Sequence, residues 1–289
     1  MNIRNLLKMT QNELKKFLPK YLKKYGYEPI VKDGFIYARG TNVEVCVVAH
    51  MDTTPYIDGR TRKRVKQIFT QDGVMWSPQG IGGDDRNGIF SILRVLETTQ
   101  LRPTILFTED EEIGCVGSTK FIQTDYIYEL SLLKFIVQID RRGRNDLVFY
   151  QDDNKAWHKW VEKITGWKTK IGSYTDICEI SPICGVASVN ISCGYYDEHT
   201  KFETIVLSEV YGTIKCLKKL LRASFDSDAF YYKEKEIIRY GSKCRNYVFD
   251  EDNTLAWFRD NCTGFPDIER CDSGFWFGLE GSTEADYDK

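Results

Sequence analysis

The sequence predicts an α/β fold in three layers, with a mixed, largely parallel sheet covered by helices on both faces. Short, continuously apolar segments recur along the chain and are typical of strands buried on both faces. Helical patterns separate these segments, and such alternation is typical of layered α/β sheets. At 289 residues the chain is long enough to bury a sizeable core.

Local patterns justify the elements in order. Thr10 and Glu13 have the spacing of a capping box and predict a helix start. Asp33-Gly34 and Asp72-Gly73 are turn sequences and predict two hairpins. The expected elements are a helix over 10–25, a hairpin over 28–39, a strand ending at 50, a hairpin over 56–79, a helix over 87–97, strands over 103–108, 134–140 and 147–152, a helix over 154–165, a strand over 185–194 and a helix over 204–222.

The pattern changes after about residue 223. Beyond it the sequence is aromatic and acidic and has no clear period. We therefore predict a folded domain at residues 1–222 and a C-terminal extension at 223–289. The role of the extension stays open between a lid, an oligomer contact and a recognition surface. A homo-oligomer is compatible with the sequence, which does not determine the oligomeric state.

Composition and charge exclude several classes of protein. Hydrophobic residues make up 42% and charged residues 28%, which is ordinary for a globular domain. The net charge of −2 does not suggest binding to nucleic acid or an anionic membrane. No segment approaches the roughly 20 apolar residues of a membrane span, and the N-terminal segment lacks the apolar block of a signal peptide. We expect neither nucleic acid nor a membrane as a partner, and a cytoplasmic location in which the nine cysteines are reduced.

Polar residues gather where the predicted strands end. His50 follows the first buried strand, residues 109–112 (EDEE) follow the next, and Asp140 ends a third. In open α/β sheets, ligands bind at the carboxyl ends of the strands. Two loops add Asp84-Asp85 and His199. We expect these groups to converge.

The chemistry of this set favours a site for two metal ions. Two histidines and three groups of carboxylates are too many ligands for one zinc ion, and they suit two divalent ions that share a carboxylate. Adjacent glutamates, Glu111-Glu112, suit divided roles as a general base and a metal ligand. Asp52 would hold the second ring nitrogen of His50 and fix its tautomer. Spacing alone does not decide which member of the pairs at 84–85 and 111–112 binds metal.

Five motifs in this order resemble the co-catalytic zinc exopeptidases, which include aminopeptidase T and the leucyl and glutamyl aminopeptidases. The motifs are AHMDTTP, GIGGDDRNG, FTEDEEIGCVGS, QID and GYYDEHT, within about residues 43–222. The resemblance implies the zinc-exopeptidase fold and a metallopeptidase that binds two divalent ions. Zinc is the first candidate, and cobalt and manganese are alternatives because oxygen-rich sites accept several ions.

The resemblance also implies a role for each matching residue. The implied metal ligands are His50 and Asp140 for one ion, Glu112 and His199 for the other, and Asp84 for both. Asp52 would orient His50, and Glu111 would be the general base for a water molecule held between the ions. The peptide bond between Asp84 and Asp85 is expected to be cis.

The spacing of the motifs narrows the substrate class. Positions 50 and 84 are 34 apart and positions 140 and 199 are 59 apart, which leaves no room for the lid or dimerisation domain inserted in some relatives. The arginine that carboxypeptidase relatives take from that domain has no clear counterpart, so we predict an aminopeptidase acting on peptides. Two alternatives stay open: a deacylase acting on a small non-peptide amide, and an inactive relative that serves as a binding module.

Weaker observations concern substrate contacts. Tyr174 and Tyr195 would donate hydrogen bonds to an oxyanion, and Arg141 would pair with a substrate carboxylate. The basic arm at residues 60–66 is better explained as a solvated hairpin edge than as a guide for acidic substrates.

Overall fold

The computed structural model describes residues 1–57, 59–235, 248–249 and 255–256, which belong to two units. The first unit comprises residues 1–171 and 175–235, and the second comprises residues 172–174 and 236–289. In its described part, the second unit contains the antiparallel pair β15 (Val248–Phe249) and β16 (Leu255–Ala256). Most of the predicted extension at 223–289 lies outside the described residues, and the division at residue 222 stays a prediction.

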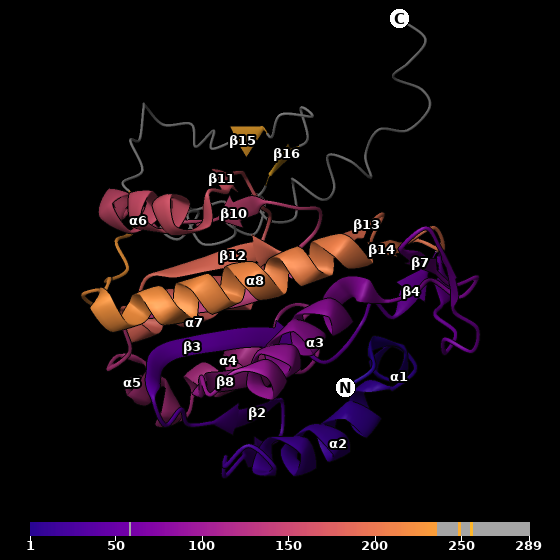
Figure 1. Cartoon of the computed structure of the whole chain (residues 1–289), viewed down its shortest axis with the longest axis horizontal. Coiled ribbons are helices and arrows are strands. Elements are labelled where there is room, and N and C mark those ends of the chain that lie inside the picture. Colours follow the sequence, from indigo (N-terminus) through magenta and orange to yellow (C-terminus); the bar gives the residue numbers. More distant parts are fainter. Residues whose placement is uncertain (58, 236–247, 250–254, 257–289) are drawn as a thin grey trace, which may run out of the picture. The chain divides into compact units, whose positions relative to one another are not determined.

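An eight-stranded mixed sheet forms the centre of the first unit (Figure 1). In order across the sheet, its strands are β1 (Ile30–Lys32), β2 (Phe35–Ala38), β8 (Pro103–Thr108), β3 (Val43–His50), β9 (Phe135–Arg141), β12 (Ser188–Ser192), β10 (Asp146–Val148) and β11 (Lys168–Thr169). The four central strands, β8, β3, β9 and β12, are parallel, whereas β2 and β10 run antiparallel to the central strands beside them. The four parallel strands therefore bring their carboxyl ends to one edge of the sheet.

Helices cover both faces of this sheet, as the sequence predicts. They are α1 (Ile3–Leu7), α2 (Gln11–Lys23), α3 (Gly83–Thr98), α4 (Val116–Ile122), α5 (Tyr126–Leu130), α6 (Lys155–Thr165), α7 (Asp176–Cys184) and α8 (Leu207–Ala223). Strand β3 shows the layering, because successive side chains of a strand point to opposite faces. Val45, Val47 and Ala49 pack in the cluster that contains α3 and α8, which cross in front of the sheet in Figure 1. Cys46 and Val48 pack in the cluster that contains α4, α5 and α7.

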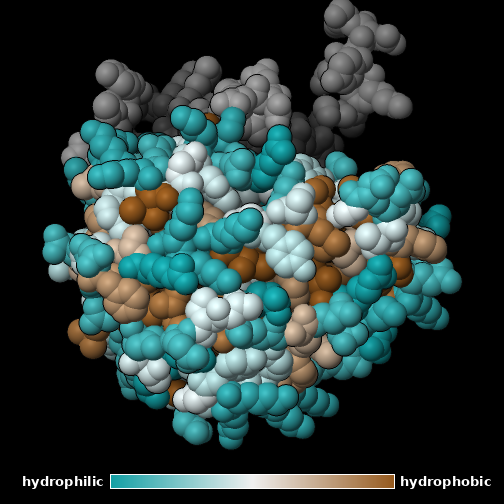
Figure 2. Space-filling model, viewed as in Figure 1, coloured by the Kyte–Doolittle hydropathy of each residue, from teal (hydrophilic) through white to brown (hydrophobic). Residues whose placement is uncertain are grey.

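Helix α8 illustrates how its sequence selects a buried face. Val210, Ile214, Leu217 and Leu221 recur at helical spacing and are buried. The residues between them on the outer face are exposed, and Figure 2 shows hydrophilic side chains along that face. Within the part of the chain that the structure describes, no helix is long and apolar enough to cross a membrane.

The region between the first two motifs differs from the prediction of one hairpin over 56–79. It contains two short antiparallel pairs, β4 (Tyr56–Ile57) with β5 (Arg60–Thr61) and β6 (Phe69–Gln71) with β7 (Val74–Trp76). The predicted turn at Asp72-Gly73 is confirmed, and both residues have positive φ, as hairpin turns of this kind require. The single-hairpin prediction is wrong because β4 pairs with β5, while β7 pairs with β6. On its other side β7 pairs with β14 (Thr204–Val206), which in turn pairs with β13 (Tyr195–Tyr196). This second sheet connects the β6–β7 hairpin to the loop between β13 and β14, which carries His199.

Two of the expected elements are shorter than predicted, because the strand expected over 147–152 is β10 at Asp146–Val148, and residues 204–206 of the helix expected over 204–222 form β14. Two other local predictions are confirmed. Thr10 and Glu13 form the capping box at the start of α2, and β1 and β2 form the hairpin that turns at Asp33-Gly34. The chain between Asp140 and His199 consists of strands of the two sheets, helices α6 and α7 and their connections, so it supplies the sheet itself.

A buried acid next to α6 allows a test of stability. Asp152 is 3% exposed; its Oδ1 accepts the N–H groups of Asn154 and Lys233 at 2.8 and 3.2 Å, and its Oδ2 has no partner among the described residues. Burial raises the pKa of Asp152 to about 6. A raised folded-state pKa contributes stability at low pH that is lost as the pH rises through 6.

We therefore expect Asp152→Asn to match the wild type near pH 4 and to be more stable above pH 7, by up to about 3 kcal/mol. Denaturant unfolding measured across this pH range tests the prediction. Asp153→Asn is the control, because the hydrogen bond from Lys155 lowers the pKa of Asp153 and its loss should not stabilise the fold. Parallel pH profiles for Asp152→Asn and wild type would contradict it.

Candidate metal centre

The structure brings the two predicted histidines to opposite sides of one carboxylate. The Nε2 atom of His50, at the end of β3, lies 3.0 Å from Oδ1 of Asp84. The Nε2 atom of His199 lies 3.3 Å from Oδ2 of the same residue. Asp84 therefore offers one oxygen to each histidine, which is the arrangement that a shared ligand requires.

One further carboxylate lies beside each histidine. Oδ1 of Asp140, near the end of β9, is 3.4 Å from Nε2 of His50. Oε2 of Glu112, in the loop after β8, is 2.7 Å from Nε2 of His199. The five residues predicted as metal ligands therefore lie together, with Asp84 in the middle.

Asp52 connects the end of β3 to the loop after β8. Its Oδ1 lies 3.1 Å from Nδ1 of His50, which leaves Nε2 of that ring directed at Asp84. The same carboxylate accepts the backbone N–H groups of Glu111 and Glu112 at 3.1 and 3.0 Å. Asp52 therefore orients the histidine and positions both adjacent glutamates.

The two adjacent aspartates have different surroundings. The peptide bond between Asp84 and Asp85 is cis, as predicted. Asp85 is fully buried and its oxygens accept the backbone N–H groups of Gly88 at 2.9 Å and His50 at 3.3 Å. The Asp85 carboxylate thus accepts hydrogen bonds from the backbone, whereas the Asp84 carboxylate faces the two histidines. This distinction, which spacing did not provide, favours Asp84 as the ligand.

Glu203 is a buried residue of the centre that the sequence analysis missed. Its two oxygens accept the N–H groups of Gly82 at 2.7 Å and of Asp84 at 3.1 Å. It is 1% exposed, and burial raises its pKa to about 7. Glu203 lies just before β14, where no strand-end pattern marked it.

Asp140 is held by polar groups from three elements. Its Oδ2 accepts the hydroxyl of Thr175 at 2.8 Å, and its N–H donates to Oδ1 of Asn190 at 2.9 Å. Tyr195 donates its hydroxyl to the Asp140 carbonyl at 2.9 Å. Thr175 and Asn190 were also missed, since each gains its role only through contacts between distant segments.

The electrostatics of the centre reflect crowded carboxylates. Burial raises the pKa of Glu111 well above its usual range, and it raises that of Asp140 to about 7. Hydrogen bonds to Asp84 and Glu112 raise the pKa of His199 to about 11. These shifts have a common origin in the negative charge that the clustered carboxylates concentrate in a small volume, which a cation would stabilise.

The residues fit divalent cations. Two ligands of a tetrahedral zinc ion at about 2.1 Å lie about 3.4 Å apart, and three of the four histidine–carboxylate separations, 3.0, 3.3 and 3.4 Å, are close to this. Oε1 of Glu112 is buried and has no hydrogen-bond partner among the described residues, so it has a free ligand position. One ligand atom from each of His50, Asp84 and Glu112 lies within 4.8 Å of the other two.

The three predicted substrate contacts are less well placed. Tyr195 is buried, and its hydroxyl bonds to Asp140. Arg141 is half-buried at the end of β9, and its Nε has no partner within the described residues. Tyr174 belongs to the second unit and directly precedes Thr175 in the chain. Their substrate roles stay predictions.

Comparison with known proteins identifies the fold. No protein-family model and no curated protein sequence matches this chain. The aminopeptidase PepT from Bacillus cereus is similar in structure, with a TM-score of 0.61 and 16% sequence identity over 77% of this chain and 97% of that one. A tripeptidase from Staphylococcus aureus has a TM-score of 0.62 and 14% identity over 78% and 97% of the two chains.

The chain has the fold of these peptidases.

The peptidase fold confirms the predicted fold class and, at the level of the fold, the resemblance carried by the five motifs. A glutaminyl cyclase from Porphyromonas gingivalis shares it, with a TM-score of 0.52 and 12% identity over 75% of this chain and 96% of that one. One fold thus supports different reactions, and the reaction must be argued from the site.

Removal of the Glu203 side chain tests its positioning role. In Glu203→Ala the N–H groups of Gly82 and Asp84 lose their acceptors, so Asp84 should become less well placed. Loss of a residue that orients a ligand typically lowers metal affinity by about 10–100-fold. Competition with a chromophoric chelator measures this affinity. Glu44→Ala, at an exposed position of β3, is the control. Equal affinities in the two variants would show that Glu203 does not support the centre.

Proposed function

We propose that the protein is a metal-dependent aminopeptidase that binds two divalent ions and hydrolyses peptides with a free amino terminus. The observation that carries this proposal is the position of Asp84 between the Nε2 atoms of His50 and His199, each with a further carboxylate beside it. The proposed ligands are His50 and Asp140 for one ion, Glu112 and His199 for the other, and Asp84 for both. The similar structures described above are an aminopeptidase and a tripeptidase, which supports peptides as the substrate class.

Different residues of the chain would bind the ions, transfer the proton and orient the ligands. Two divalent ions, zinc first among the candidates, would supply the charge that polarises a carbonyl and lowers the pKa of a water molecule. Glu111 would take the proton of the attacking water and return it to the leaving amine. Its backbone N–H is fixed by Asp52, as is that of Glu112, so base and ligand keep their relative positions. Asp52 would hold His50 in the tautomer that presents Nε2.

Substrate panels distinguish this proposal from its alternatives. An aminopeptidase should hydrolyse aminoacyl-anilides, a deacylase should hydrolyse N-acyl amino acids, and a binding module should hydrolyse neither panel. A homo-oligomer stays a prediction that sedimentation analysis would test.

Glu111→Gln removes the proposed base and keeps the size of the side chain. We expect turnover to fall by about 10²–10⁴-fold, because general-base catalysis typically contributes this much. Metal content should not change, since Glu111 is not among the proposed ligands. Steady-state kinetics and elemental analysis of the same sample provide both measurements.

Asp110→Asn is the matched control in the same loop. Asp110 has a φ of 57°, a conformation that asparagine also tolerates. Its side chain accepts a hydrogen bond from Gln11, away from the proposed ligands. Turnover in Glu111→Gln within tenfold of this control would remove Glu111 from the mechanism.

Metal removal and His199 variants test the centre itself. Chelation should abolish activity, and zinc, cobalt or manganese should restore it. Elemental analysis should find two ions per chain in the wild type and about one in His199→Ala. His158→Ala is the control, because His158 stacks on Phe149 with ring centroids 3.9 Å apart, and it should retain both ions. Activity that survives complete metal removal would contradict the proposal.

A further inference from the structure

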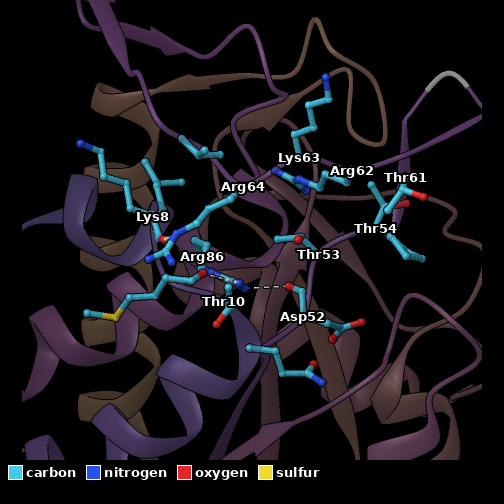
Figure 3. A pocket seen from close by; sticks show the side chains of 15 residues that line it. Lys8, Thr10, Asp52, Thr53, Thr54, Thr61, Arg62, Lys63, Arg64 and Arg86 are labelled. Atoms are coloured by element: carbon cyan, nitrogen blue, oxygen red, sulfur yellow. Dashed lines mark hydrogen bonds between the residues drawn. The ribbon is translucent and has the colours of Figure 1, made fainter.

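The basic segment at residues 60–66 contains one side chain that turns inward. Arg62 is half-buried, and its backbone N–H donates to the carbonyl of Pro55 at 2.8 Å. Figure 3 shows Arg62 on the wall of a pocket that Thr53 and Arg86 also line. The other basic residues of the segment are exposed; they are Arg60, Lys63, Arg64 and Lys66. The predicted solvated hairpin edge therefore describes these four residues and not Arg62.

The guanidinium of Arg62 lies on the glycine loop at residues 80–82, which leads to Asp84. Its Nη2 donates to the carbonyl of Gly80 at 3.0 Å. Gly82 has a φ of 73° and lies directly against the same nitrogen, since a Cβ atom added there would be 2.4 Å from Nη2. Glycine alone suits both this backbone conformation and this close approach. Arg62 therefore contacts the glycine loop at both ends, just before the proposed shared ligand.

The glycine loop also lies against the segment that carries His199. A Cβ atom added to Gly80 would be 3.0 Å from the carbonyl oxygen of Thr200, the residue that follows His199. From the same segment, Glu203 accepts the two backbone N–H groups described above. The glycine loop thus has Arg62 on one side and residues 199–203 on the other. A displacement of the loop would move the proposed shared ligand relative to His199.

The hydrogen bond to Gly80 does not by itself explain the charge of Arg62, because a neutral amide would donate to the same carbonyl. Close to Arg62 lies a second guanidinium, that of Arg86, which is buried and donates to the carbonyls of Met51 and Asp52. Burial and the charge of Arg62 lower the pKa of Arg86 to about 10, so the two cations repel each other. Burial raises the pKa of Glu203, and the charge of Arg62 is the largest influence that opposes this shift. Arg62 thus balances part of the negative charge beside the glycine loop.

We propose that Arg62 is a positioning residue of the metal centre, which holds the glycine loop where Asp84 faces both histidines. The inference rests on the proposed two-ion site. Arg62 acts through its hydrogen bond to Gly80 and through its charge beside Glu203, and it touches neither metal nor substrate. The basic segment after β4 thereby supports the centre through one of its residues.

Arg62→Gln tests this role, with Arg60→Gln as the matched control. Both variants lose one positive charge from the same segment, but Arg60 is exposed on β5, whereas Arg62 contacts the glycine loop. Zinc affinity of the metal-free protein, measured by competition with a chromophoric chelator, should fall about 10–100-fold in Arg62→Gln, as is typical for residues that orient a ligand. Arg62→Lys keeps the charge and should recover part of this loss. Arg60→Gln should bind zinc as the wild type does.

Hydrogen exchange of the metal-free protein measures the position of the glycine loop without metal or substrate. Backbone N–H groups at residues 80–86 should exchange several-fold faster in Arg62→Gln than in Arg60→Gln, because the loop loses a contact that limits its opening. Exchange in the central strand β3 should be the same in both variants. Equal exchange at residues 80–86, or equal zinc affinity, would overturn the proposal. Faster exchange in β3 as well would assign the effect to general destabilisation and would also overturn it.

Kinetics at saturating zinc separates positioning from substrate binding. Excess zinc should return kcat of Arg62→Gln to within a few-fold of the wild type, with KM unchanged. A raised KM that zinc does not correct would make Arg62 a substrate contact and overturn the proposal. If the wild type binds two ions and hydrolyses no peptide, the peptidase function fails, and zinc affinity and hydrogen exchange still decide the role of Arg62. A wild type that binds no divalent ion would overturn both proposals.

Discussion

The hydrogen bonds of the Asp52 carboxylate are the constraint on which the candidate centre depends. This group is 9% exposed, and a buried carboxylate is stable only when its oxygens have partners. Its partners are the His50 ring and the N–H groups of Glu111 and Glu112. One side chain thus fixes the ring on β3 and the loop after β8, so a ligand of each proposed ion and the proposed base are positioned together.

The position of Asp84 also depends on a buried carboxylate that accepts hydrogen bonds from backbone N–H groups. Glu203 holds the segment from Gly82 to Asp84 by two such bonds, and β14, which begins at the next residue, pairs with β7. Asp52 and Glu203 therefore position the neighbouring acidic residues through hydrogen bonds to the backbone. This arrangement leaves negative charge concentrated around Asp84, where two cations would be stabilised by it.

The parts of the fold that the sequence predicts are those set by local pattern. Continuous apolar segments predicted β3, β8 and β9, and the polar residues at their ends were correctly placed beside one another. Glu203 and Arg86 could not be assigned in this way, because their partners lie on segments far away in sequence and leave no spacing signal. The single hairpin over 56–79 was wrong for a different reason, since β4 and β5 form a short local pair of their own beside the pair of β6 and β7.

The similarity to peptidases at 14–16% identity follows from the same division between local pattern and specific contact. A layered sheet needs apolar residues of about the right size at its core positions, and many different residues meet that need. The centre needs only a few groups at the strand ends.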